Sequence, residues 1–96
     1  MLSSAQRAKL RSMASTMEPI VHIGKDGISA NLIKQADDAL EARELIKGTV
    51  LQNSEYTAKE ALNELAQALK AEAVQSIGRK FVLYRPSQKN PQITLK

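Results

Sequence analysis

The 96-residue sequence predicts one α+β domain built in two layers, with helices packed against a four-stranded mixed β-sheet. Two observations support this fold class. Segments with apolar residues at helical spacing alternate with short runs rich in β-branched residues, in the order α-β-α-β-α-β-β. The length suits a single core, because a chain of this size buries only roughly 60 to 65% of its unfolded surface on folding. Residues 1–96 are therefore expected to form one domain.

The first predicted helix covers residues 4–15, and a short strand follows it. Ser3 with Gln6 three residues later is the pattern of a capping box at the start of a helix. Pro19 ends this helix, because proline disfavours the α conformation in the residue before it. The β-branched run over 20–23 then predicts a buried strand.

Residues 29–51 predict a second helix and a second strand. Ser29 can cap a helix that ends near Arg43, and the composition of Leu45–Leu51 is typical of a strand. A strand, a helix and a strand in succession favour two parallel strands joined by a right-handed crossover.

The C-terminal part predicts a third helix and a β-hairpin. Thr57 with Glu60 is a second capping-box pattern, and it opens the helix. The runs AVQSI and KFVLYR then flank Gly78 and Arg79, and a two-residue turn with glycine first suits a type II′ hairpin. Pro86 ends the last strand.

The composition predicts a cytoplasmic protein held together by packing alone. No stretch of about 18 apolar residues could span a membrane, and the N-terminal residues lack the pattern of a signal peptide. Without cysteine there is neither a disulfide nor a thiolate zinc site. We expect a monomer that needs no cofactor, with a loosely held polar tail from about residue 87.

Charge is segregated along the chain, and the net value of +4 conceals this. Residues 1–36 carry five Lys/Arg against two acids, residues 37–72 four against eight, and residues 73–96 five against none. If the fold brings the two basic ends together, one face becomes cationic, which is typical of proteins with phosphate-rich partners. The other interpretation is that the lysines only aid solubility.

The stretch IGKDGIS places two glycines between the first strand and the second helix. Gly24 and Gly27 permit positive φ and carry no Cβ to hold another molecule away. The helix that Ser29 opens points its free N–H groups at whatever lies before the loop, which makes a cradle for a phosphate. Lys25 adds a positive charge, whereas Asp26 opposes it or bonds the turn's own backbone. A plain turn is the alternative, since G-x-x-G alone is a weak pattern.

The sequence gives little support for nucleotide binding, metal binding or acid–base catalysis. The loop lacks the spacing of a nucleotide-binding P-loop and the third glycine of a dinucleotide fingerprint. His22 is the single histidine, so a metal site is not expected. Asp37, Asp38 and Glu41 are expected on a solvated helix face, with Lys34 pairing Asp38, so no acid–base pair supports a hydrolase or nuclease.

The chain has three aromatic residues, two of them in the last strand. Phe81 and Tyr84 alternate onto opposite faces, so Phe81 is expected in the core and Tyr84 at the surface. With so few rings, stacking on several bases is not expected. Any nucleic acid should be held mainly by its backbone.

Four segments resemble one known family. LSSAQRAKLRSMA, PIVHIGKDGIS, NLIKQADDALEARELIK and VQSIGRKFVLYRPS, in this order from Leu2 to Ser87, are similar to the CRM domain, the chloroplast RNA splicing and ribosome maturation module. The likeness is greatest to its stand-alone bacterial form, the YhbY-like proteins.

The resemblance implies an RNA-binding domain that is not an enzyme. It implies a fold related to the C-terminal domain of bacterial translation initiation factor 3 and a G-x-x-G loop like that of KH domains. The implied partner is precursor large-subunit ribosomal RNA or the assembling particle. Carried over by position, the implied RNA-binding residues are Gly24, Lys25, Asp26, Gly27, Arg7, Arg11, Arg79 and Arg85.

Three positions depart from the family pattern. Asp26 replaces a neutral asparagine, Gly48 stands where a β-branched residue is usual, and Ala71 lies near a common helix-ending glycine. The first weakens attraction for phosphate, and the other two concern stability. A different class of function also stays open, a protein-interaction module whose basic ends dock on an acidic ribosomal protein or assembly factor.

Overall fold

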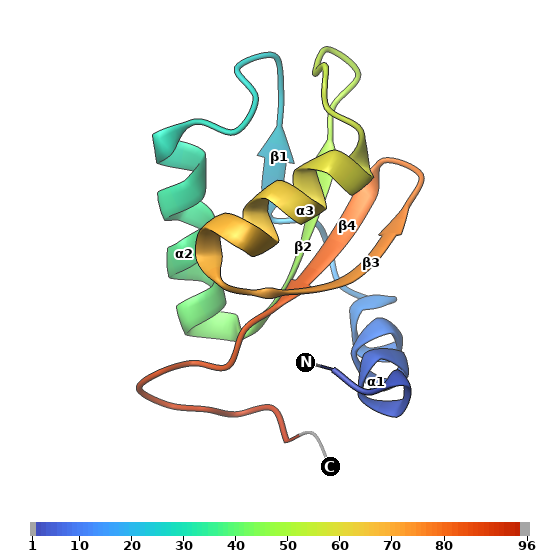
Figure 1. Cartoon of the computed structure of the whole chain (residues 1–96), viewed down its shortest axis with the longest axis vertical. Coiled ribbons are helices and arrows are strands. Elements are labelled where there is room, and N and C mark those ends of the chain that lie inside the picture. The colour runs from blue at the N-terminus through green and yellow to red at the C-terminus, as the bar shows by residue number, and fades with distance from the viewer. Residues whose placement is uncertain (1, 95–96) are drawn as a thin grey trace.

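A computed structural model describes residues 2–94, and within them three helices and four strands follow one another in the predicted order (Figure 1). The helices are α1 (Ser4–Ala14), α2 (Ala30–Arg43) and α3 (Ala58–Leu69). The strands are β1 (Val21–Ile23), β2 (Leu45–Val50), β3 (Glu72–Ile77) and β4 (Lys80–Tyr84). The α+β class expected from the sequence is confirmed.

The helix starts are those that local side-chain chemistry predicts. Ser3 with Gln6, and Thr57 with Glu60, form reciprocal capping boxes in which each side chain accepts a backbone N–H of the other residue. Ser29 caps α2 through its side-chain oxygen. These bonds satisfy N–H groups that the first turn of a helix leaves without partners.

The four strands form one mixed sheet in the order β1-β2-β4-β3. β1 pairs parallel with β2, as the strand-helix-strand pattern predicts, while β4 pairs antiparallel with both β2 and β3. Gly78 in the β3–β4 turn has φ +58°, as a type II′ turn requires of its first central residue. The β1–α2 loop, the β2–α3 loop and this turn all lie at one end of the sheet, which we call the loop end (Figure 1).

Helices cover both faces of the sheet. α2 and α3 enclose the larger core on one face, where Phe81 is buried as predicted. α1 lies on the other face and buries Leu10 and Ala14 against Val82 and Tyr84, so helices and sheet form three layers where two were expected. The expected surface position of Tyr84 is wrong, because its face of the strand is the one that α1 covers.

Packing explains why a glycine occupies position 48 in β2. Gly48 lies opposite Phe81 in the β2–β4 register, and the Phe81 ring crosses the space that a side chain at 48 would fill. A Cβ atom built at Gly48 would come within 2.2 Å of Cζ of Phe81. The departure from a β-branched residue at this position therefore makes room for the central ring of the core.

The tail after β4 is held by buried and half-buried carboxylates. Glu44 is 1% exposed, and its carboxylate accepts the backbone N–H groups of Ser87, Gln92 and Ile93, each at 2.7 Å. Glu41 accepts the Ser87 hydroxyl at 2.5 Å. The sequence analysis expected a loosely held tail, but these contacts tie residues 87–93 to the end of α2. Burial acts to raise the pKa of Glu44, yet the three N–H donors outweigh it and hold that pKa below 4.5.

We predict that Gly48→Ala destabilises the fold by about 1–3 kcal/mol, because the added methyl group overpacks the Phe81 ring. Chemical denaturation measures this, with Ser76→Ala at an exposed strand position as the control. In a Phe81→Leu background, Gly48→Ala should lower the free energy of unfolding by less. Equal losses in both backgrounds would contradict the steric explanation.

We predict that Glu44→Gln lowers the free energy of unfolding by roughly 1–3 kcal/mol at pH 7, because it removes the anion that three N–H groups share. Folding lowers the pKa of Glu44, so its contribution is complete above about 4.5 and disappears as pH falls through the lower folded value. The difference in free energy of unfolding between wild type and variant should therefore become smaller at acidic pH. Glu55→Gln, at an exposed position, is the matched control, and a gap that does not change with pH would refute the carboxylate tether.

Candidate nucleic-acid interface

The G-x-x-G loop forms a tight turn between β1 and α2. The N–H of Gly27 donates to the carbonyl oxygen of Gly24 at 3.1 Å, so this amide is used within the turn. Lys25 and Asp26 lie exposed at its tip. Within residues 2–94 the Asp26 carboxylate accepts no hydrogen bond, so the alternative in which it bonds the turn's backbone is not observed.

The two glycines have different roles. Gly27 has φ +66°, and a Cβ there would lie 2.9 Å from Cε2 of Tyr56. Gly24 does not have a positive φ, and its nearest neighbours would stand at ordinary contact distances of 3.6 and 3.7 Å. Gly27 therefore needs glycine for its backbone conformation and for its close packing against Tyr56. At Gly24 the side chains of Leu51 and Asn53 lie beside the position of a Cβ atom at ordinary contact distances, so no comparable need for glycine exists there.

The first turn of α2 supplies the expected N–H groups. Leu32 and Ile33 donate to the side chain and carbonyl of Ser29. In the described part of the chain, the N–H groups of Ala30 and Asn31 meet no protein acceptor. Beside this first turn lies a cavity of about 250 Å³, the loop hollow, which is lined chiefly by His22, Gly24, Lys25, Asp26, Gly27 and Asn31.

Tyr56 supports the loop from beneath. It belongs to the β2–α3 connection, packs against Gly27, and donates its hydroxyl to Glu64 at 3.0 Å. The hydrogen bond to Glu64 raises the pKa of Tyr56, so the ring stays neutral and keeps this bond across the physiological range. This role of Tyr56 is not apparent from the sequence, because its partner Gly27 lies 29 residues away.

Two of the four arginines named from the sequence use their guanidinium groups inside the fold. Arg7 donates to the carbonyls of Ala73 and Val74 on the edge strand β3. Arg85 forms an ion pair with Asp37 at 2.7 Å and donates to the carbonyl of Leu69 at 3.0 Å, and its side chain is only 16% exposed. Both groups join elements of the fold in this conformation.

The other two arginines lie exposed at different places. Arg79 occupies the β3–β4 turn and, with Tyr56, lines a cavity of about 280 Å³ at the loop end. Arg11 lies on α1, beside the sheet face that this helix partly covers. Gly24, Lys25, Asp26, Gly27 and Arg79 thus share the loop end, whereas Arg11 belongs to a second surface.

Asp37 and Asp38 lie exposed on α2, as expected, whereas Glu41 is half-buried. Lys34 pairs with Asp38 at 3.4 Å, as the i, i+4 spacing predicts. Asp37 instead binds Arg85, and Glu41 holds the tail. In the part of the chain that the structure describes, no group of three or more His, Cys, Asp and Glu side chains could hold a metal ion.

Comparison with known proteins decides the family. The CRS1 / YhbY (CRM) domain pattern matches residues 2–85. The chain belongs to the CRM domain family. It is 45% identical to Probable RNA-binding protein YqeI of Bacillus subtilis over 99% of both chains, and 34% identical to an RNA-binding protein of Haemophilus influenzae over 91% of this chain and 88% of the relative. The solution structure of a hypothetical Staphylococcus aureus protein, 49% identical, covers all of both chains with a TM-score of 0.82.

The CRM resemblance stated from the four sequence segments is confirmed. Among the described residues of this CRM chain, no helix is both long and apolar enough to cross a membrane.

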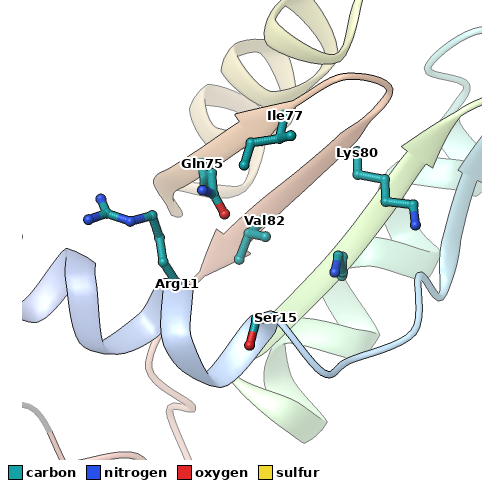
Figure 2. A pocket seen from close by; sticks show the side chains of 7 residues that line it. Arg11, Ser15, Gln75, Ile77, Lys80 and Val82 are labelled. Atoms are coloured by element: carbon teal, nitrogen blue, oxygen red, sulfur yellow. The ribbon is translucent and has the colours of Figure 1, made fainter.

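A second surface of this CRM domain, not expected from the sequence, lies beside α1. Lys47 and Lys80 accompany Arg11 around an open part of the sheet, and Gln75 and Ile77 lie beside them (Figure 2). Strand alternation was the signal that could have found them, because it places Lys47 on the face of β2 opposite the buried Ile46. The pairing of β2, β4 and β3 that brings the three strands together could not be derived from spacing alone.

We predict that Gly27→Ala and Gly24→Ala differ sharply in stability. Gly27→Ala should cost about 1–3 kcal/mol, because it combines a left-handed φ with a Cβ pressed against Tyr56. Gly24→Ala should change the free energy of unfolding by less than about 0.5 kcal/mol. Urea denaturation of both variants checks this, and equal losses would show that the turn does not depend on Gly27 in this way.

Proposed function

We propose that this CRM chain binds RNA and holds a backbone phosphate in the loop hollow. The observation that carries the proposal is the geometry of that hollow, where the Ala30 and Asn31 N–H groups meet no protein acceptor in residues 2–94 and both loop glycines form part of the lining. Family membership supports it, because relatives that match nearly the whole chain are named as RNA-binding proteins.

A helix N-terminus suits a phosphate for two reasons. Its N–H groups point at the ligand, and the aligned peptide dipoles place the equivalent of about half a positive charge there. Lys25 at the exposed tip adds a mobile cation, and Arg79 offers another at the same end of the sheet. The cavity of about 250 Å³ suits one phosphodiester of a nucleic-acid backbone. This binding needs no sequence readout, since phosphates are common to every nucleotide.

In the proposed binding mode, Arg7 and Arg85 stabilise the domain and do not contact RNA. Their guanidinium groups hold β3 to α1 and β4 to α2 and α3, so they fix the shape of the domain that presents the loop. The finer role follows the family resemblance: RNA of the maturing large ribosomal subunit is the proposed target, and the domain acts by binding and without catalysis. A domain docking on an acidic protein instead would fail to bind naked RNA.

We predict that Lys25→Ala weakens RNA binding and lowers the magnitude of the slope of log K against log[salt] by roughly 0.7 to 0.9, as loss of one phosphate contact requires. Fluorescence anisotropy of a labelled RNA across a salt series measures both quantities. Lys59→Ala removes an exposed charge on α3 and should leave the slope unchanged. An unaltered slope for Lys25→Ala would take this lysine out of the interface.

A further inference from the structure

A groove lies where α1 stops short of the sheet. The apolar contacts of α1 reach Leu45, Val74, Val82 and Tyr84, which leaves the part of this face nearer the β3–β4 turn uncovered. The open part forms a cavity of about 250 Å³, the sheet groove, between the last turn of α1 and strands β2, β3 and β4 (Figure 2). Its walls are formed chiefly by Arg11, Ser15, Lys47, Gln75, Ile77 and Lys80.

The charges around the sheet groove are all positive. Arg11, Lys47 and Lys80 line it, and no acidic side chain does so in the described part of the chain. Lys47 donates to the carbonyl of Ala14 at the end of α1. The side chains of Arg11 and Lys80 take part in no hydrogen bond or ion pair within residues 2–94, so both cations remain available to an anionic ligand.

The floor of the groove is apolar. A phosphate alone would need only the cations, so the apolar floor indicates that the ligand also has an apolar part. Ile77 is 65% exposed, a large apolar side chain outside both cores, and buried Val82 lies beside it on the neighbouring strand. Gln75 faces the same space with an amide that bonds nothing in residues 2–94, and it can both donate and accept. An apolar surface next to an amide and two unpaired cations fits a planar, polar-edged ring attached to a phosphate.

We propose that the sheet groove takes one unstacked nucleotide of single-stranded RNA. The base lies against Ile77 and Val82 with its edge toward Gln75, and Arg11 and Lys80 bind the adjoining phosphates. The inference rests on the proposed RNA-binding function and specifies its substrate. A duplex cannot fill the groove, because its bases are stacked and paired, whereas single-stranded segments present theirs.

Sheet register connects the groove with the loop hollow. His22 pairs with Thr49, Thr49 with Lys80, and Lys80 with Ile77, so these four residues form one row across all four strands. His22 lines the loop hollow at one end of the row, and Ile77 lines the groove at the other. Three strand spacings of about 4.8 Å separate the ends by ~14 Å, which a few nucleotides of one strand can span. This shared row, which contains no acid, favours one RNA strand over a separate acidic protein as the occupant.

The decisive experiment compares a labelled single-stranded oligouridine with a duplex RNA of equal length, using the whole chain. Ile77→Thr keeps a β-branched residue at an exposed strand position, so the fold should be retained. It should weaken single-strand binding about fivefold, as loss of an apolar contact of one or two methylene groups implies, at an unchanged salt slope. Duplex binding should stay within about twofold of wild type. Lys80→Ala should instead reduce the salt slope by about 0.7.

Two matched controls lie outside the groove. Met13→Gln removes an exposed apolar side chain from α1, and Lys59→Ala removes a cation from α3 on the opposite face. Both should bind single strands as wild type does. Photo-crosslinking of a 4-thiouridine oligomer gives a second measurement, with attachment expected in a peptide that contains residues 75–82. Crosslinks confined to residues outside this segment would overturn the inference.

The outcomes separate this inference from the function on which it rests. If Lys25→Ala weakens RNA binding but Ile77→Thr and Lys80→Ala match wild type, RNA binding stands and the groove is not an RNA site, which leaves it to an acidic protein. If Ile77→Thr weakens duplex and single strand equally, the assignment to an unstacked nucleotide is overturned. If the wild-type chain binds neither RNA, the proposed function and this inference both fail.

Discussion

Parallel pairing of β1 with β2 is the constraint on which the rest of the structure depends. Two parallel neighbours must be joined by a crossover, and here α2 makes it, so the start of α2 stands at the end of the sheet where β1 stops. β2 ends on the same side, and its connection to α3 brings Tyr56 beneath Gly27. Phe81, packed across Gly48 at the centre of the sheet, stabilises this arrangement. The G-x-x-G turn is thus held by strand direction and by a ring below it.

Features determined by neighbouring residues could be predicted from the sequence, and features determined by distant ones could not. The capping boxes, the Ser29 cap and the glycine turns each depend on a few adjacent residues, and the structure contains them. Glu44 binds a segment more than forty residues away, and Arg85 binds Asp37 at a similar separation. Helical spacing says only that a charged side chain points outward. It says nothing of the tail that later covers that side chain.

Charge counted along the chain overstated the cationic face. The basic C-terminal segment 73–96 includes Arg85, which an ion pair removes from the surface, and the Arg7 guanidinium likewise binds backbone carbonyls. Near the two candidate sites, the remaining cations are Lys25 at the loop hollow and Arg11, Lys47 and Lys80 around the sheet groove. A ligand that neutralises both sites must cross the sheet face between them.

The two proposed sites would attract a phosphate by different means. At the loop tip Asp26 opposes the charge of Lys25, so the proposed attraction combines that lysine with backbone N–H groups that are fixed before the ligand arrives. The sheet groove depends on long, mobile cations whose interaction with a phosphate is screened by salt. In the proposed binding mode, Asp26 would limit nonspecific attraction at the tip, so that the positions of the backbone amides select the anion.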